Sequence, residues 1–221
     1  MQIKNYQHII WDWNGTLFND VKFCADIMNK LLKARSLPAI TLEKYREIFT
    51  FPVKDYYIEA GYDFVNESFE EISVDFMAEY ESRKGGCTLY PFAAEVLEKF
   101  HSFRIKQHLL SAYKQNNLKD IIKHFGIEKF FNSVRGLDHI YADGKMELGK
   151  QLMKDISTNG NDNKILLIGD TVHDFEVAQG LNTDCILISN GHQNGEKFKS
   201  LNIPVYNSLE EIFLLLKEKG I

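Results

Sequence analysis

The sequence alternates short apolar runs with segments of helical periodicity, and this alternation limits the folds that the chain can adopt. The apolar residues within each short run are continuous rather than alternating, which is typical of strands covered on both faces. Strand alternating with helix predicts an α/β fold with a parallel sheet and right-handed crossovers. The expected strands are 6–12 (YQHIIWD), 105–111 (IKQHLLS), 164–170 (KILLIGD) and 184–189 (DCILIS), and the expected helices are about 91–103, 115–125, 146–156, 174–180 and 208–219.

The segment from about 20 to 84 departs from this rhythm. It contains no convincing strand, whereas 21–34 (VKFCADIMNKLLKA) and 67–83 (ESFEEISVDFMAEYESR) place apolar residues at helical spacing. We therefore expect a small helical domain over residues 18–85, inserted into a core formed by 1–17 and 86–221. Within the insert we interpret LPAI (37–40) and FPVK (51–54) as turns, and KGG (84–86) as the hinge back to the core.

Composition and charge exclude several classes of function. The 221 residues are 44% hydrophobic, which suffices for one domain with a smaller insert, and the net charge of −5 argues against a nucleic-acid surface. The start of the chain, MQIKNYQHII, lacks a basic region followed by a long apolar run, and no stretch approaches the ~18 apolar residues of a membrane span. We expect a cytoplasmic protein without a membrane or nucleic-acid partner, as a monomer or weak homo-oligomer.

The three cysteines, Cys24, Cys87 and Cys185, are isolated in the sequence and show no CxxC spacing. This pattern predicts neither a disulfide framework nor a zinc site.

Reactive residue types follow three of the expected strands. In an open parallel sheet, ligands bind beyond the carboxyl ends of the strands, and Asp12, Ser111 and Asp170 stand at those positions. Asp174 follows Asp170 by four residues across a turn that opens a helix, so the two carboxylates can face one cation. Oxygen ligands of this kind suit Mg²⁺, which commonly serves phosphate chemistry. Gly15 and the backbone amides around Asn14 are expected to cradle an anion.

Together these motifs resemble the haloacid dehalogenase superfamily of phosphatases, in particular phosphoglycolate phosphatase-like members with a helical cap. The resemblance rests on DWNGTL (12–17), on Ser111 after an apolar strand, on a lysine ahead of LLIGDTVHD (166–174), and on a helical insert directly after the first motif. It covers nearly the whole chain and implies a Rossmann-like, doubly wound parallel sheet with the insert as cap.

The resemblance also implies roles for individual residues. Asp12 would be the nucleophile that forms an aspartyl-phosphate, and Ser111 would hydrogen-bond the transferring phosphoryl group, with Ala112 and Gly15 beside the substrate. A lysine would neutralise charge on the nucleophile and the phosphate. Asp12, Asp170, Asp174 and the backbone carbonyl of Asn14 would hold Mg²⁺. The cap would close over the site and carry specificity for a small phosphorylated metabolite.

Two lysines compete for the role in phosphate binding. Lys145 stands at the mouth of the expected helix after Gly144, from where it would point toward the strand ends, whereas Lys150 lies more than one turn inside the helix. We expect Lys145 to be the site lysine.

Asn14 departs from the family pattern, which usually has aspartate at this position. In the family that side chain protonates the leaving oxygen and later activates water, a contribution of ~10²–10⁴ in rate that an amide does not supply. Three hypotheses follow: the substrate has a leaving group that needs little protonation, such as an acyl or aryl phosphate; another group, such as His173 or a cap residue, supplies the proton; or the Asn14-Gly15 pair deamidates to a carboxylate.

Structural roles are the default for several nearby residues. We interpret Trp11 and Trp13 as core residues, His173 as a surface residue or one behind the site, FPVKDYY (51–57) as cap packing, and His192 as part of a loop turn. Two other classes of function compete with the Mg²⁺-dependent phosphohydrolase. One is a binding protein or sensor for phosphorylated ligands that has lost turnover with Asn14. The other is a dehalogenase or a phosphonate-cleaving enzyme; the carbon–halogen branch of the family works without Mg²⁺, so the Asp170/Asp174 pair argues against it.

Overall fold

The computed structural model describes residues 3–157 and 164–217. Its main feature is a six-stranded sheet in which every neighbouring pair of strands is parallel. From one edge to the other, the order is β5 (Ser133–Leu137), β4 (Lys106–Lys114), β1 (His8–Trp11), β6 (Ile165–Gly169), β7 (Asp184–Ile188) and β8 (Val205–Tyr206). The predicted parallel α/β sheet is therefore confirmed.

The order of the strands shows that the sheet is doubly wound. From β1 the chain moves outward through β4 to β5, then returns to β6 on the other side of β1 and moves outward again. This reversal places β4 and β6 on the two sides of β1, so the three strands that carry the predicted motifs are direct neighbours. In folds of this kind the reversal point is where ligands bind.

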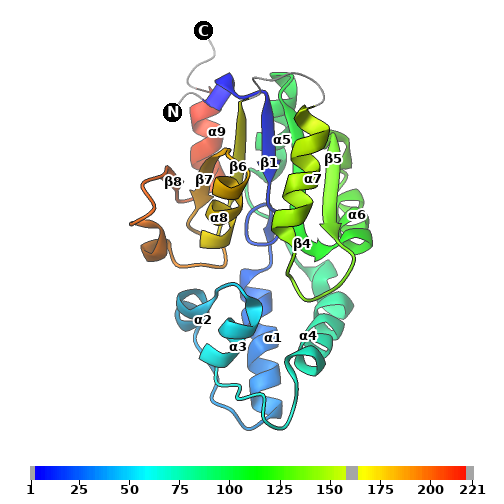
Figure 1. Ribbon diagram of the computed structural model, residues 1–221, viewed down its shortest axis with the longest axis vertical. Coiled ribbons are helices and arrows are strands. Elements are labelled where there is room, and N and C mark those ends of the chain that lie inside the picture. The colour runs from blue at the N-terminus through cyan, green and yellow to red at the C-terminus, as the bar shows by residue number, and fades with distance from the viewer. Residues whose placement is uncertain (1–2, 158–163, 218–221) are drawn as a thin grey trace.

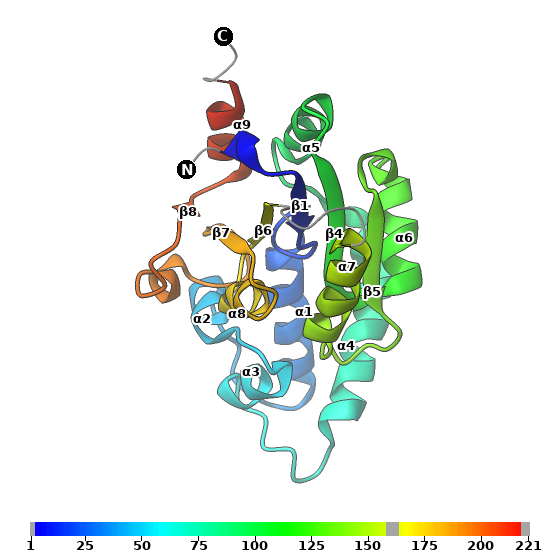
Figure 2. The same ribbon diagram turned by 45° about the horizontal axis from the view of Figure 1, so that its top comes forward.

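Helices cover both faces of the sheet (Figures 1 and 2). Successive side chains of a strand point to opposite faces, so Ile9 and Trp11 pack into one apolar cluster and Ile10 into the other. This double coverage explains why the strands are continuously apolar. The first cluster is covered by α5 (Ala93–Ser102), α6 (Gln115–His124) and α9 (Leu209–Lys217), and the second by α7 (Lys145–Ser157) and α8 (Val172–Gly180).

Four helices from the predicted insert gather at the lower end of the molecule in Figure 1, beyond the carboxyl ends of the strands. Two were predicted, and α1 has the predicted bounds because its apolar side chains recur at helical spacing and are buried. The other two are short and were missed; Val53 already belongs to α3, so the interpretation of FPVK as a turn is wrong from that residue onward. The helices are α1 (Val21–Ala34), α2 (Leu42–Ile48), α3 (Val53–Glu59) and α4 (Phe69–Arg83).

A two-stranded antiparallel ribbon joins the places where the chain leaves the core and returns to it. It pairs β2 (Phe18–Asn19) with β3 (Thr88–Leu89), and the short 3₁₀ helix Lys84–Gly86 precedes β3. Both strands lie outside the segment from about 20 to 84, so the expectation that this segment contains no strand is confirmed. The cap boundaries 18–85 stay a prediction.

The sequence also missed two core strands and one strand end. The edge strand β5 reads SVRGL, whose Arg135 and Gly136 interrupt the apolar pattern, and β8 has two residues. Strand β4 continues past the predicted end at Ser111 to Lys114, with a shift in register after Leu110.

The sequence predicts neither a disulfide framework nor a membrane-spanning segment. The three cysteines are free thiols. No helix within the described ranges combines the length and the apolar character needed to cross a bilayer.

Candidate active site

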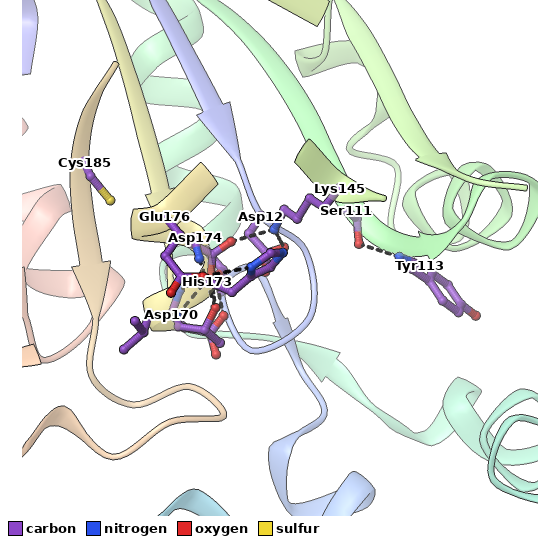
Figure 3. A network of polar contacts seen from close by, with 12 residues as sticks. Asp12, Ser111, Tyr113, Lys145, Asp170, His173, Asp174, Glu176 and Cys185 are labelled. Atoms are coloured by element: carbon purple, nitrogen blue, oxygen red, sulfur yellow. Dashed lines mark hydrogen bonds and ion pairs between the residues drawn. The ribbon is translucent and has the colours of Figure 1, made fainter. Parts of the chain in front are cut away.

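The site lies where β1 and β6 end side by side, next to the irregular part of β4. Asp12 and Asp170 each follow the last residue of a strand, and the Asp12 amide still donates to the carbonyl of Ile168 on the neighbouring strand at 2.9 Å. Both carboxyl groups are buried. Figure 3 shows them at the tips of their strands, near Lys145 and Asp174.

Lys145 connects Asp12 with Asp174. Its Nζ donates to Asp12 Oδ1 and, at 2.6 Å, to Asp174 Oδ1, and all three side chains are buried. Lys145 is the first residue of α7, so its side chain leaves the helix at the end nearest the strand tips. Lys150 is half exposed and pairs with Glu147 at 2.6 Å. The structure thus brings Lys145, and not Lys150, to Asp12.

Asp174 is fixed by the start of α8. Thr171 is the N-cap residue and its side chain accepts from the Asp174 amide, while Asp174 Oδ2 accepts from Thr171 N at 3.0 Å and from Thr171 Oγ1 at 2.7 Å. This capping box satisfies amides that a helix start leaves without partners. It uses one oxygen of Asp174 and turns the other toward Lys145.

Asp170 is held by the loops that flank it. Its Oδ1 accepts from the Thr16 hydroxyl at 2.9 Å, and its Oδ2 accepts from the His192 amide at 2.6 Å. Gly15 and Gly191 pack so closely that an added Cβ at either would lie 2.2 Å from Asp170 Oδ2. The two glycines therefore allow the loops to close around this carboxyl group.

Burial and mutual repulsion shift the pKa values of the carboxyl groups. Burial raises the pKa of Asp12 to about 6, against the opposing effect of Lys145. Burial, with the charges of Asp12 and Asp174 and against His192, raises the pKa of Asp170 to about 8. For Asp174, burial acts upward, but Lys145 and Thr171 keep the pKa below its usual range. The cluster therefore has more negative charge than its one lysine balances.

This excess charge fits a bound cation. Asp12, Asp170 and Asp174 each offer a carboxylate oxygen, and these oxygens lie within 4.8 Å of one another. A hard cation such as Mg²⁺ prefers oxygen ligands and keeps several waters, so a few converging carboxylates suit it. The three residues therefore fit the metal that the sequence predicts, and a cation here would offset their repulsion.

A small cavity of about 40 Å³ adjoins these groups, and Ser111, Ala112 and Lys145 are among its lining residues. Ser111 is buried within β4, at the register shift after Leu110, and its Oγ accepts from the Tyr113 amide at 3.1 Å (Figure 3). The irregular strand lets Ser111 and Ala112 lie at the site although β4 continues beyond them. The cavity has room for little more than one tetrahedral group.

The Asn14 side chain points away from the carboxylate cluster. Its Nδ2 donates to Asp20 Oδ2 at 2.7 Å and to the Tyr80 hydroxyl at 2.8 Å. Because a carboxylate only accepts hydrogen bonds, the amide nitrogen is the atom that must face Asp20.

Gly15 differs from its predicted role. Its amide donates to Phe18 O at 2.9 Å and to Asp20 Oδ1 at 3.1 Å, so it is not free to cradle an anion. Its positive φ of 76° and its contact with Asp170 explain the glycine instead.

Asp20 and His192 form a buried pair that the sequence did not reveal. His192 Nε2 lies 3.2 Å from Asp20 Oδ1, and Nδ1 lies 2.7 Å from the Tyr45 hydroxyl. Burial acts to lower the pKa of His192, but Asp20 raises it above its usual value. The interpretation of His192 as a plain loop turn is therefore incomplete. The only signal for Asp20 was a carboxylate shortly after the first motif.

His173 lines the 40 Å³ cavity, but it is partly exposed. Its ring stacks on Phe51, with centroids 4.7 Å apart, and Nδ1 lies 3.3 Å from Glu176. The structure thus places His173 at the mouth of the site, between core and cap. Trp11 and Trp13 are fully buried core residues, as expected.

Comparisons with known proteins agree with this geometry. The model of the haloacid dehalogenase-like hydrolase family matches residues 9–188. Two curated relatives are phosphoglycolate phosphatases: one from Psychrobacter arcticus, 23% identical with 89% of each chain covered, and one from Rhodobacter capsulatus, 22% identical with 84% of this chain and 85% of the relative covered.

Solved structures show the same fold. A haloacid dehalogenase-like hydrolase from Streptococcus pneumoniae superposes with a TM-score of 0.78 at 17% identity, and a predicted phosphatase from Clostridium acetobutylicum with 0.76 at 18% identity; each comparison covers 96% of this chain and 99% of the other. The predicted likeness to phosphoglycolate phosphatases on a Rossmann-like core is confirmed. The chain belongs to the haloacid dehalogenase-like hydrolase family.

Proposed function

We propose that the protein is a Mg²⁺-dependent phosphatase that hydrolyses a small phosphorylated metabolite through an aspartyl-phosphate on Asp12. The observation that carries this proposal is the position of Asp12: it is buried, paired with Lys145, and within 4.8 Å of oxygens from Asp170 and Asp174. The names of the curated relatives and the phosphate-sized cavity support the same substrate class.

Each residue of the site has its own role in this reaction. An oxygen of Asp12 attacks phosphorus, and the bond to the leaving oxygen breaks with its electron pair. Lys145 and the hydroxyl of Ser111 stabilise the phosphoryl oxygens as charge develops on them. Asp12, Asp170, Asp174 and the Asn14 carbonyl would hold Mg²⁺, which supplies further charge neutralisation. Water then attacks the aspartyl-phosphate, releasing phosphate and restoring Asp12.

The test is phosphate release from a panel of small phosphorylated compounds, with Mg²⁺ or with EDTA. We expect release that requires Mg²⁺, that Asp12→Asn abolishes, and that Lys145→Met lowers at least ~10²-fold. Lys150→Met is the matched control and leaves the rate unchanged, because Lys150 lies on the surface. Equal rates for wild type and Asp12→Asn would refute the nucleophile assignment.

A second candidate follows from Asn14. The Asn14 amide faces Asp20 and carries no acidic proton for the leaving group. If the protein has lost turnover for this reason, it is a binding protein for phosphorylated ligands. Thermal stabilisation by phosphorylated ligands in Mg²⁺, without release of phosphate from any member of the panel, would favour this candidate. A cytoplasmic location and a monomeric or weakly associating state remain predictions.

A further inference from the structure

A second, larger cavity adjoins the site on its cap side. It measures about 150 Å³ and lies between the cap helices, the end of β4 at 112–114 and the core loop at 140–142. Asn14, Phe49, Phe51, Ala112 and His192 line both this cavity and the smaller one beside Asp12. A molecule with its phosphoryl group in the small cavity would therefore place its leaving group in the larger one.

The lining of the larger cavity is mainly aromatic and apolar. A dry apolar cavity of about 150 Å³ is large enough to hold one benzene molecule, so the size matches a single aromatic ring. The aromatic lining residues are Tyr45, Phe49, Phe51, Tyr56, Tyr57, Phe69, Phe76, Tyr80, Tyr113 and Tyr141.

The charges in the lining disfavour a leaving group that carries a carboxylate. Asp20 is buried there, and the basic lining residues within the described ranges are Lys114 and His192. His192 is already engaged with Tyr45 and Asp20. A buried carboxylate needs a close cation or several donors, and Lys114 is the one lysine of this lining that is available to a ligand at the cavity's edge.

Among the described residues, the lining contains one buried side-chain polar atom without a hydrogen-bond partner. This atom is the hydroxyl oxygen of Tyr56. Buried polar groups are rarely left unpaired, and a polar substituent on a bound ring reaches this hydroxyl only if neighbouring side chains shift.

The chemistry of Asn14 favours a weakly basic leaving group. Its amide nitrogen is held by Asp20 and Tyr80, so it does not protonate the departing oxygen. A phenol has a pKa of roughly 10, whereas alkyl alcohols lie nearer to water, at ~15.7. A phenolate therefore departs without the acid that an alkoxide requires.

We propose that the substrate is the phosphate monoester of a single-ring phenol, with the ring in the 150 Å³ cavity. This inference rests on the proposed phosphatase function. In the first step the bond from Asp12 to phosphorus forms and the bond from phosphorus to the phenolic oxygen breaks. The electron pair leaves on the phenolate, which takes a proton from solvent. Water then cleaves the aspartyl-phosphate to inorganic phosphate.

The experiment compares three substrates in wild type and in two variants of α4. Phenyl phosphate has both a ring and a weakly basic leaving group, acetyl phosphate has only the latter, and 2-phosphoglycolate has neither. Met77→Trp fills the cavity from its lining. Val74→Trp adds the same ring three residues earlier on the same helix at an exposed position, and serves as the matched control.

We expect wild type to hydrolyse phenyl phosphate with a kcat/KM at least ~10-fold above that for 2-phosphoglycolate. Met77→Trp lowers kcat/KM for phenyl phosphate at least ~10-fold, because contacts of one or two methylene groups already discriminate by that factor. The value for acetyl phosphate stays within ~3-fold, which also shows that the variant is folded. Val74→Trp changes neither value. If Met77→Trp does not fold, Ser73→Leu fills the same cavity.

The outcomes separate this inference from the proposed function. Mg²⁺-dependent hydrolysis of acetyl phosphate with no preference for phenyl phosphate, or with equal losses on both in Met77→Trp, overturns the aryl ester and leaves the phosphatase standing. If no substrate is hydrolysed, phenylphosphonate still tests the cavity without turnover. A larger thermal stabilisation by phenylphosphonate than by methylphosphonate, absent in Met77→Trp, would support the ring site although the phosphatase fails; equal stabilisation overturns it.

Discussion

Replacing Asn14 by the aspartate usual in the family tests how the site is held together. The Asn14 amide nitrogen lies 2.7 Å from Asp20 Oδ2, so Asn14→Asp places a second carboxyl group at that separation from the buried Asp20. At an effective dielectric constant of ~20, two unit charges 2.7 Å apart repel by about 6 kcal/mol. Keeping one of them protonated at pH 7 costs about 4 kcal/mol, from an ordinary aspartate pKa of ~3.9. Protonation is cheaper, so the pair shares one proton.

The shared proton makes the loss of stability depend on pH. The folded variant has a carboxyl pKa raised above its unfolded value, so it binds a proton that the unfolded chain has released above pH ~4. The loss in the free energy of unfolding of Asn14→Asp is therefore small near pH 4 and grows as pH rises. At 1.36 kcal/mol per pH unit, it grows by about 2.7 kcal/mol between pH 5 and pH 7. His192 attracts the charged form of Asp20 and so offsets part of the repulsion. The loss of about 4 kcal/mol in the free energy of unfolding at pH 7 is therefore an upper value.

Urea unfolding in EDTA at pH 5, 6 and 7 measures this effect for wild type, Asn14→Asp and Asn14→Ala. The alanine variant loses the hydrogen bond to a charged group, about 1.5–3 kcal/mol, without adding a carboxyl group, so its deficit stays nearly constant with pH. A deficit for Asn14→Asp that is equal at pH 5 and pH 7 would refute the reasoning.

Three other predictions concern charge and chemistry at the site. Lys145→Met leaves Asp12 and Asp174 buried without their cation, so the free energy of unfolding in EDTA drops by about 3–5 kcal/mol; Lys150→Met is the control, and a loss below ~1 kcal/mol would contradict the pairing. Since burial raises the pKa of Asp12 to about 6 and that of Asp170 to about 8, protons compete with Mg²⁺ at low pH; thermal shifts should show greater stabilisation by Mg²⁺ at pH 8.5 than at pH 6, and equal shifts would count against the site. Asn14 should remain an amide during storage of folded protein, because its side chain and the Gly15 amide are both hydrogen-bonded; peptide mass spectrometry showing rapid conversion to aspartate would disprove this.

The local sequence determined most of the core fold. Strands β1 and β6 are covered on both faces, so nearly every residue in them is apolar, and such runs are visible without any tertiary information. The same applies to α1, whose apolar face repeats at helical spacing. Short elements escaped because two or seven residues hold too few periods to show a pattern: α2, α3, β2 and β8 belong to this group.

The sequence by itself placed Asp12 and Asp170 at the ends of strands, because a charged residue that terminates an apolar run is a local signal. The same signal at Ser111 was misleading, since β4 continues to Lys114. Only the tertiary structure decided which strands became neighbours, that Lys145 rather than Lys150 reaches Asp12, and that Asn14 faces Asp20 and Tyr80. It also decided that aromatic residues from the three cap helices α2, α3 and α4 line one cavity beside the site. These features depend on contacts between residues far apart in the chain. No spacing within a single segment encodes such contacts, because they form only when the sheet and the cap pack together.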